Sequence, residues 1–410
     1  MKAARTGAAL LVGFLLGAWL TLSLQSSGQI ATEPGTLARP STHARGVPTP
    51  EPTPRFAAPV VRPEAPRTFL AWTPGGLPAG FRDAVRDVPG IEHSVVVASD
   101  VAWMTRSLAA DGTVVDGPPG GLAIPVEVAG VDPAEYAPFL PPADRWLVVS
   151  LARGRGVMGR MSSQVRGFGD GGRLVFGSNQ VSVAAVVADE LVGANELMVS
   201  RATAARLGVR TDRYALLQPA DGISELGLVR RLRAILPAAE PLRVRAPGET
   251  PYFRQGDAVL PQVRLKQLFG EFAARPEGGE LQTDPAWEAT HIATERVPIL
   301  GEVRCNRGLF ARLRGALREV VRDGLAPEIH PNEYGGCYSP RFALHHAGAG
   351  LSHHAWGVAI DLDVAENPYG ERPTMDPRVV AIFRRWGFAW GGDWLIPDGM
   401  HFEFHDSPRA

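Results

Sequence analysis

Cysteine is scarce in this chain of 410 residues, and neither sign of charge is in excess. Only Cys305 and Cys337 occur, and neither lies beside a histidine at zinc-finger spacing, which excludes a zinc finger. In an oxidising compartment they would form one disulfide, and two free thiols are the alternative. The 42 basic and 43 acidic residues give a formal net charge of -1. This balance gives no overall attraction to nucleic acid or to an anionic surface, so a charged partner needs a local site.

Hydrophobic residues make up 45% and charged residues 21% of the chain, which is typical of globular proteins. This composition excludes a fibrous or wholly disordered protein. The length is sufficient for two domains, each with its own core.

An uncharged segment, Gly7 to Leu24, follows the basic residues Lys2 and Arg5. At about 1.5 Å per residue in a helix, it nearly spans the roughly 30 Å hydrocarbon core of a bilayer. We predict an uncleaved signal anchor within residues 1–28, with its basic end inside, because the following SLQSSGQ offers no clear cleavage site. A cleaved signal peptide is the alternative. Both interpretations place the rest of the chain outside the cytoplasm.

Residues 29–66 are rich in proline, as the stretch PTPEPTP illustrates. Such a segment lacks the apolar residues for a core and favours extended polyproline II geometry. We therefore predict a linker that holds the folded parts away from the membrane.

Residues 67–298 are predicted to form an α+β module whose chemistry the sequence does not disclose. Residues 67–99 and 213–246 each follow the order strand, glycine-containing turn, amphipathic helix, proline break and strand. Part of the strand-rich region between them, with SVAAVVADELVGANELMVSRATAARLGV, resembles extracytoplasmic domains of transporter permeases of the FtsX type. No cluster of metal-ligating residues stands here. We expect a binding, positioning or structural role, and a cell-envelope protein could bind through this module.

The chemistry is expected in residues 299–410, because eight of the ten histidines lie at or beyond His291. The segment LSHHAWGVAIDLDV contains a predicted strand with apolar residues on one face and Asp361 and Asp363 on the other. That strand follows a turn holding His353 and His354. Strand and turn together could grip a metal.

A second alternating segment, DGMHFEFH, places His401, Glu403 and His405 on one side of a strand. Catalytic zinc takes three protein ligands, histidine or carboxylate, and leaves a fourth position for water. His354 and Asp361 together with His401 satisfy that count.

Water that is activated by zinc and attacks a carbonyl also needs a carboxylate that takes its proton. Asp398, three residues before His401, is the candidate base. Glu403 is the competing base, since it shares a strand face with His401. Asp363 and Glu403 are otherwise expected to be supporting or salt-bridged groups that orient the histidines, whereas His330 is expected to be a hydrogen-bonded surface or core residue and not a ligand.

Two motifs make the C-terminal region recognisable. The first, S-x-H-x-x-G-x-A-x-D, is formed by Ser352, His354, Gly357, Ala359 and Asp361, and the second is WGGDW followed by D-x-M-H-F-E. Together they resemble the D-alanyl-D-alanine carboxypeptidase and L-alanyl-D-glutamate peptidase family of zinc enzymes (VanY-like). The resemblance covers roughly the last hundred residues. It implies that His354, Asp361 and His401 bind Zn2+, that Asp398 is the base, and that Arg341 in GCYSPR anchors the substrate.

One departure concerns the substrate. The vancomycin-resistance members of the family carry E-x-x-H, whereas this chain has Asp398 three residues before His401, as in the branch that resembles phage endolysins. The shorter side chain favours an endopeptidase slightly over a carboxypeptidase.

The predicted function is hydrolysis of peptide bonds in peptidoglycan stem peptides, by either a carboxypeptidase or an endopeptidase. A catalytically silent wall-binding or scaffold protein is the alternative. A metallopeptidase acting on proteins is a third, and its commonest form is excluded because H-E-x-x-H is missing.

The predicted architecture is α+β throughout. A membrane helix, a proline-rich linker and an α+β module precede a C-terminal zinc peptidase domain with a small antiparallel sheet and flanking helices. One of these helices should be capped by Asn306 and stop at Gly324, and the other should begin with Asp376 and Pro377 and end at Gly387.

Overall fold

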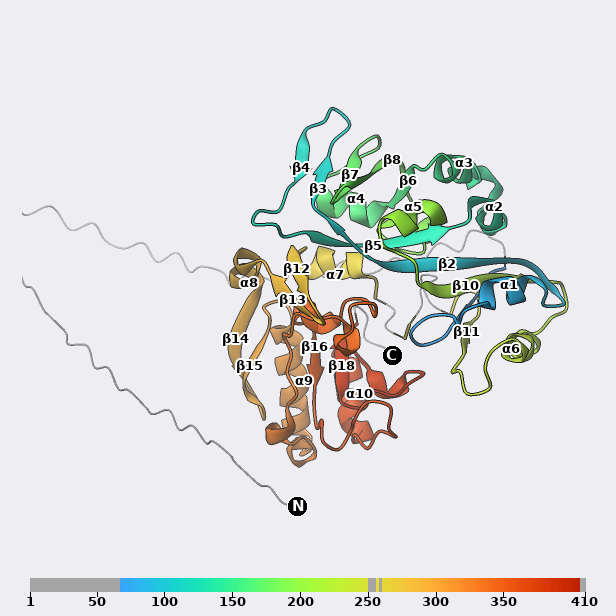
Figure 1. The fold of residues 1–410 in the computed structure, drawn as a ribbon. Helices are drawn as coiled ribbons and strands as arrows, with labels where there is room; N and C mark the ends of the chain where they lie inside the picture. Colours follow the sequence, from blue (N-terminus) through green and yellow to red (C-terminus); the bar gives the residue numbers. More distant parts are fainter. Residues whose placement is uncertain (1–66, 250–255, 258–259, 406–410) are drawn as a thin grey trace, which may run out of the picture. The chain divides into compact units, whose positions relative to one another are not determined.

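The computed structural model describes residues 67–249, 256–257 and 260–405 (Figure 1). The predicted signal anchor, residues 1–28, and the predicted linker, residues 29–66, lie outside this part of the chain. Among the described residues, none of the helices has the length and apolar character needed to cross a bilayer.

A mixed sheet of eleven strands dominates the first part, in the order β11-β1-β10-β2-β5-β9-β6-β8-β7-β3-β4. We call it the large sheet. Its pairings are antiparallel except for β5 with β9 and β6 with β8. The strands are β1 Phe69–Trp72, β2 Ile91–Met104, β3 Arg106–Leu108, β4 Val114–Asp116, β5 Ile124–Val131, β6 Gly156–Gly159, β7 Arg173–Phe176, β8 Asn179–Val187, β9 Leu197–Ser200, β10 Asp212–Pro219 and β11 Arg243–Arg245.

The described α-helices that accompany these strands are α1 Phe81–Arg86, α2 Pro133–Tyr136, α3 Leu147–Ala152, α4 Arg160–Arg166, α5 Arg201–Arg206, α6 Glu225–Ala234 and α7 Gln262–Phe269. The two predicted strand–helix–strand units are present as β1-α1-β2 and β10-α6-β11. They lie side by side, because β1 pairs with both β10 and β11.

Helices cover both faces of the strands in these units. In β2, Val95 and Val97 join one hydrophobic cluster with α2 and α3, whereas Val96 joins another with α1 and α6. Successive side chains of a strand point to opposite faces. A strand buried on both faces is therefore a continuous apolar run rather than an alternating one.

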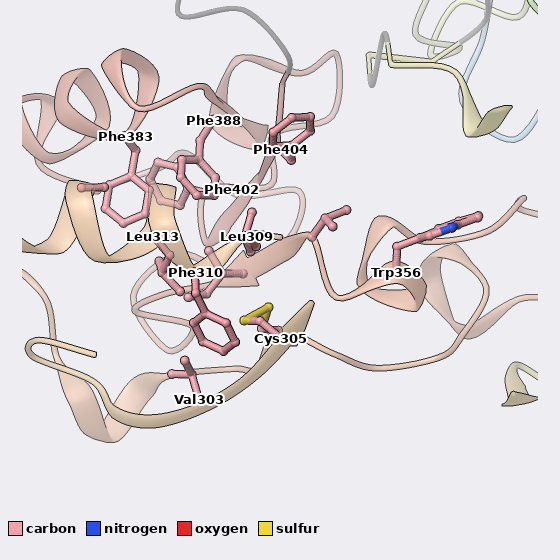
Figure 2. Packing of buried hydrophobic residues seen from close by; sticks show 14 of the residues in the cluster. Val303, Cys305, Leu309, Phe310, Leu313, Trp356, Phe383, Phe388, Phe402 and Phe404 are labelled. Carbon is pink, nitrogen blue, oxygen red and sulfur yellow. A yellow bond between two sulfur atoms is a disulfide. The ribbon is translucent and has the colours of Figure 1, made fainter. Parts of the chain in front are cut away.

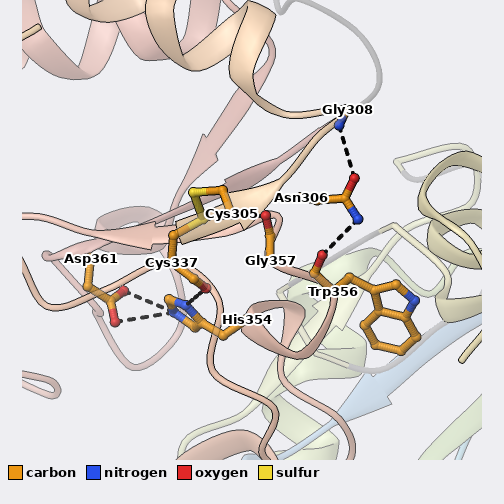
Figure 3. Close-up of a disulfide and its surroundings, with 8 residues drawn as sticks. All are labelled: Cys305, Asn306, Gly308, Cys337, His354, Trp356, Gly357 and Asp361. Carbon is orange, nitrogen blue, oxygen red and sulfur yellow. Dashed lines mark hydrogen bonds and ion pairs between the residues drawn. A yellow bond between two sulfur atoms is a disulfide. The ribbon is translucent and has the colours of Figure 1, made fainter. Parts of the chain in front are cut away.

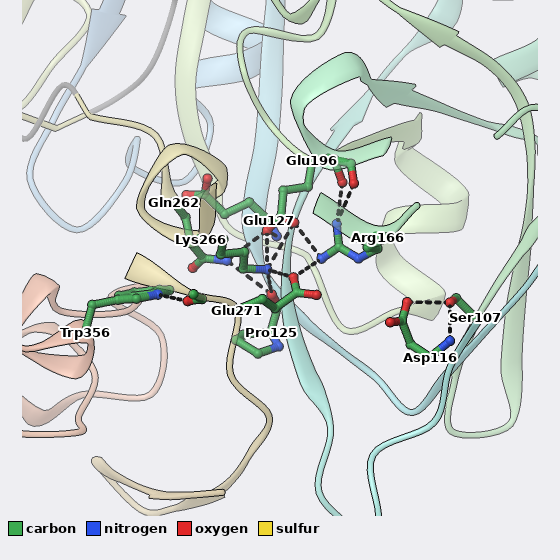
Figure 4. A network of polar contacts seen from close by, with 12 residues as sticks. Ser107, Asp116, Pro125, Glu127, Arg166, Glu196, Gln262, Lys266, Glu271 and Trp356 are labelled. Carbon is green, nitrogen blue, oxygen red and sulfur yellow. Dashed lines mark hydrogen bonds and ion pairs between the residues drawn. The ribbon is translucent and has the colours of Figure 1, made fainter. Parts of the chain in front are cut away.

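A buried ion network ties α4 and α7 to the large sheet (Figure 4). Glu196 lies 2.7 Å from Arg166 of α4 and 2.8 Å from Lys266 of α7. Glu271 lies within 3 Å of the same two cations. Because the Glu196, Arg166 and Lys266 side chains are fully buried, each charge depends on its partners.

The second part of the chain is built on hairpins, helices and a small sheet. Its elements are β12 Ala274–Glu277, β13 Glu280–Thr283, α8 Pro285–His291, β14 Ile292–Val297, β15 Gly301–Asn306, α9 Phe310–Arg322, β16 Ala359–Asp361, α10 Pro377–Arg385, β17 Phe388–Trp390 and β18 His401–Phe404. The order β16-β18-β17, antiparallel throughout, makes the small sheet. The predicted mixture of helices and strands, with a small antiparallel sheet in the C-terminal region, is confirmed, and the eleven-stranded large sheet is an additional finding.

One hydrophobic core underlies the small sheet. Figure 2 shows Phe310 and Leu313 of α9 packed with Phe383 of α10 and Phe402 of β18. The same core includes residues from Leu260 onward. The boundary drawn between residues 298 and 299 stays a prediction, and it falls in the turn between β14 and β15.

The predicted start of α10 is confirmed. The Asp376 side chain accepts a hydrogen bond from the Arg378 backbone amide at 2.7 Å, and Pro377 occupies the first turn. Gly387, at φ 83°, follows the end of the helix.

The predicted cap of α9 was wrong. Leu309 is the N-cap, and Asn306 is the last residue of β15. The buried Asn306 amide donates to the Trp356 carbonyl at 3.1 Å and accepts from the Gly308 amide at 3.0 Å. A tertiary contact and a local turn therefore occupy the side chain that was expected to cap the helix.

Candidate metal centre

Three polar side chains converge at one end of the small sheet. Asp361 ends β16 and His401 begins β18, and the antiparallel register places them directly opposite each other. His354 comes from the short 3-10 helix His353–Trp356, which Ser352 caps by accepting from the His354 amide. Gly357 ends this turn at φ 67°, a conformation that glycine adopts readily.

The three ligand atoms form a nearly equilateral triangle. His354 Nε2 lies 3.2 Å from Asp361 Oδ1 and 3.3 Å from His401 Nδ1, and His401 Nδ1 lies 3.0 Å from Asp361 Oδ1. Zinc bonds of about 2.0–2.2 Å in tetrahedral geometry put ligand atoms roughly 3.3 Å apart. Both histidines are buried. The donor set and its spacing therefore fit one face of a zinc tetrahedron.

The second ring nitrogen of His354 is held by the backbone. His354 Nδ1 lies 2.8 Å from the carbonyl oxygen of Cys337, which assigns the proton to Nδ1 and leaves the Nε2 lone pair for a metal (Figure 3). Cys337 forms a disulfide with Cys305 of β15, so the expected disulfide is present. The disulfide thus anchors the carbonyl that orients His354.

Glu403 contacts the ring nitrogen of His401 that does not face Asp361. Its Oε2 lies 3.3 Å from His401 Nε2 and 2.8 Å from His353 Nδ1. Burial would raise the pKa of Glu403, but the two histidines outweigh it and lower that pKa. For His401, burial lowers the pKa, and hydrogen bonds to Asp361 and Glu403 raise it to about 10. The carboxylates of Asp361 and Glu403 therefore favour positive charge at the position of His401.

Asp398 lies on the loop between β17 and β18. Its amide donates to the Gly391 carbonyl at 2.9 Å, and its own carbonyl accepts from the His401 amide at 3.1 Å. A Cβ on Gly391 would come within 2.5 Å of the Asp398 carbonyl oxygen, so only glycine permits this closure. Among the described residues, the buried Asp398 Oδ1 has no hydrogen-bond partner. Burial and the Asp361 charge raise the pKa of Asp398.

Arg341 lies just before the loop that leads to His354. Its guanidinium is close enough for its charge to lower the pKa of Asp398, although burial of that carboxyl acts more strongly in the other direction. The Arg341 carbonyl accepts from the Ser352 amide at 3.1 Å, which holds the residue beside the capped turn. The structure thus places Arg341 within electrostatic reach of Asp398.

Residues 345–404 match the family model for D-alanyl-D-alanine carboxypeptidase. The resemblance inferred from the two motifs is confirmed for this C-terminal region. The matched segment contains His354, Asp361, Asp398 and His401, whereas Arg341 precedes it. A search of curated proteins found no match to the chain.

Two solved structures show a distant likeness. One is the periplasmic region of MacB from Actinobacillus actinomycetemcomitans, 10% identical, covering 44% of this chain and 88% of that one, with a TM-score of 0.31. The other is the extracellular domain of the noncanonic ABC-type transporter YknZ from Gram-positive bacteria, 13% identical, covering 43% and 99%, with a TM-score of 0.29. Similarity this low establishes neither a shared fold nor a shared function.

Asp363 is salt-bridged, which is one of its two expected roles, but its partner is His330 and not one of the histidines that converge on the site. The strand ends at Asp361, and Asp363 takes up φ 50°, which breaks the expected alternation. Its carboxylate accepts from the His330 amide at 2.6 Å and lies 3.2 Å from His330 Nδ1. His330 is thus an exposed, hydrogen-bonded residue, as expected, although with Glu333 and Asp363 it also forms a second group of potential ligands.

Trp394 contacts the site. Its ring centroid lies 5.1 Å from that of His401. Trp356 is instead fully buried, and Trp390 donates to the Gly399 carbonyl at 2.8 Å. The position of Trp394 depends on the fold of the loop, which its spacing from His401 does not reveal.

Proposed function

We propose that this protein is an extracytoplasmic zinc-dependent peptidase that hydrolyses peptide bonds in peptidoglycan stem peptides. His354, Asp361 and His401 hold the metal. The observation that carries the proposal is their mutual spacing of 3.0 to 3.3 Å within a segment that matches a peptidase family.

A zinc ion bound there supplies Lewis acidity, which activates water and polarises the scissile carbonyl. Asp398 accepts the proton of the attacking water and passes it to the leaving amine. A raised pKa suits this exchange, because a base is most effective when its pKa lies closer to the working pH. The planar guanidinium of Arg341 binds a carboxylate or carbonyl of the substrate.

Glu403 is the less suitable base. Its carboxylate is engaged by both His353 and His401, and their charges keep its pKa low. Asp398 Oδ1 is unpartnered among the described residues. Glu403 therefore orients His401, and Asp398 handles the proton.

The disulfide agrees with an oxidising compartment, and so does the hydrophobic run near the N-terminus. In this proposal residues 1–28 anchor the chain in the cell membrane and residues 29–66 serve as the tether. Residues 67–298 form a module that could bind a cell-envelope protein. Protease treatment of intact and permeabilised cells tests the location outside the cytoplasm. The protease should cut the folded part of the chain equally in both.

The enzymatic test uses the full chain, zinc and a defined pentapeptide stem, with products identified by mass spectrometry. Loss of one terminal residue identifies a carboxypeptidase, and an internal cut identifies an endopeptidase. Asp398→Ala should abolish cleavage and retain zinc. Asp393→Ala, which removes a carboxylate of the same loop that pairs with Arg384, should leave cleavage unchanged.

Three outcomes would count against the proposal. Undiminished cleavage by Asp398→Ala rules out the assigned base. Cleavage that survives complete chelation rules out the metal. Binding of muropeptides by the zinc-loaded chain without any product favours a wall-binding protein that has lost turnover.

A further inference from the structure

Residues 391–398, which make up most of the loop between β17 and β18, form a compact unit. Within it, the amides of Trp394 and Asp398 both donate to the Gly391 carbonyl, at 3.0 and 2.9 Å. One end of the unit presents Trp394 to the ring of His401, and the other carries Asp398. A shift of this loop would therefore move the candidate base.

Leu395, next to Trp394, contacts the large sheet. Its side chain packs against the hydrophobic cluster that contains Leu70 of β1, Val95 of β2 and Leu216 of β10. Burial of an aliphatic side chain in such a cluster is favourable in proportion to the apolar area removed from water. The loop is thus attached to a part of the chain far away in sequence.

A polar contact reinforces this attachment. The Leu395 amide donates to Asp257 Oδ2 at 2.8 Å. Asp257, with 10% of its side chain exposed, lies 3.6 Å from Arg243 of β11, and Arg245 of the same strand donates to the Gly256 carbonyl. An edge strand of the large sheet therefore holds the acceptor of the loop amide.

The loop before His354 is held from the large sheet as well. Arg213 of β10 donates to the Gly348 carbonyl, and its guanidinium also pairs with Asp100 at 3.0 Å. Two residues after His354, the Trp356 indole donates to the Gly270 carbonyl at 3.2 Å. Gly270 directly precedes Glu271 of the buried ion network shown in Figure 4.

We propose that the large sheet is a positioning element of the peptidase site, and that Leu395 and Asp257 are the positioning residues that fix the base-bearing loop. This inference rests on the proposed function. Its physical basis is preorganisation: a displacement of about 1 Å can reduce a rate roughly a hundredfold. In the described part of the chain, no hydrogen bond or ion pair joins Leu395 or Asp257 to the ligand triangle or to Asp398 Oδ1, so they act through the loop.

The test compares Leu395→Ala and Asp257→Ala with two matched variants in the full chain. Asp257→Asn keeps an oxygen acceptor for the Leu395 amide. Glu249→Ala removes the other carboxylate near Arg243, at 3.7 Å, and does not touch the loop. Hydrogen–deuterium exchange is followed for residues 391–398 and for α10, and kcat and KM are measured on the pentapeptide stem.

In both disrupting variants, loop amides should exchange about tenfold faster and kcat should fall about tenfold, with a smaller change in KM. Exchange in α10 should not change, which shows that the fold persists. Asp257→Asn and Glu249→Ala should behave as the wild type does.

Unchanged loop exchange in both disrupting variants overturns the inference, and so does faster exchange with unchanged kcat. If the wild type cleaves no stem peptide, the proposed function fails. The exchange measurement then still decides whether the large sheet holds this loop.

Discussion

The Nδ1 atom of His354 donates to the carbonyl oxygen of Cys337 at 2.8 Å, and the opposite nitrogen of the same ring faces Asp361. One backbone carbonyl thus sets both the tautomer and the direction of the imidazole. Since Cys337 is bonded to Cys305, the covalent framework and the candidate metal site are mechanically connected.

Replacement of a ligand should remove the metal. We expect Asp361→Ala and His401→Ala to weaken zinc binding by more than about a hundredfold, the upper range for loss of a supporting partner, because each removes one corner of the triangle. Bound zinc is measured after dialysis against a weak chelator. His93→Ala alters an exposed histidine of β2 and should retain zinc. Full zinc occupancy in both ligand variants would contradict the assignment.

Removal of the disulfide should weaken both the fold and the metal site. The 32-residue separation of Cys305 and Cys337 corresponds to roughly 3–4 kcal/mol of unfolding free energy in the chain-entropy model. The paired Cys305→Ala, Cys337→Ala variant should lose about that much in urea titrations. Zinc affinity should fall about tenfold, because the carbonyl that orients His354 is less firmly held. Reduction of the wild type should have the same effect, and a reductant should not alter the double variant.

Glu403→Gln separates an orienting role from a base. Gln keeps an oxygen that can accept from His401 but removes the charge, so zinc affinity should fall about 10- to 100-fold. At saturating zinc, kcat should return to near the wild-type value. Isothermal titration and steady-state kinetics measure the two quantities. A kcat that stays low with zinc fully bound would make Glu403 the base instead of Asp398.

The ligand triangle could be predicted because short-range patterns determine it. In the observed antiparallel register of β16 and β18, Asp361 faces His401, and the spacing from His354 to Asp361 covers only one turn and one short strand. Polar residues at alternating positions of two such strands identify that shared face. The helix start at Asp376 could be predicted for the same reason, since the side chain binds an amide two residues ahead.

What the sequence did not reveal depends on distant partners. Asn306 has the chemistry of a cap, but its amide binds the Trp356 carbonyl across 50 positions of the chain. Asp363 leaves the strand to bind His330, and nothing in the alternation indicates where a strand ends. The attachment of Leu395 to the large sheet is likewise a tertiary contact, and local periodicity carries no information about it.

The buried ion network should make the stability of the fold depend on acid. Burial alone would raise the pKa of Glu196, but the charges of Lys266 and Arg166 outweigh it and lower that pKa to about 2. A carboxyl whose pKa is lower in the folded state contributes stability above its unfolded value, 4.5, and this stability is lost as pH falls toward 2. In that window the unfolded state binds more protons, so stability rises with pH.

We therefore expect the unfolding free energy to fall by on the order of 3 kcal/mol between pH 5 and pH 2 through Glu196 alone. Glu196→Gln should lower stability at pH 7 by about 3–5 kcal/mol, because it leaves the buried cations Arg166 and Lys266 to share the single carboxylate of Glu271. The same variant should lose less stability on acidification than the wild type does. Urea titrations at several pH values measure both effects, and Glu190→Gln, an exposed carboxylate nearby, should match the wild type. Identical acid dependence in Glu196→Gln and the wild type would show that other carboxylates govern acid unfolding, because only the loss of this one charge separates the two chains.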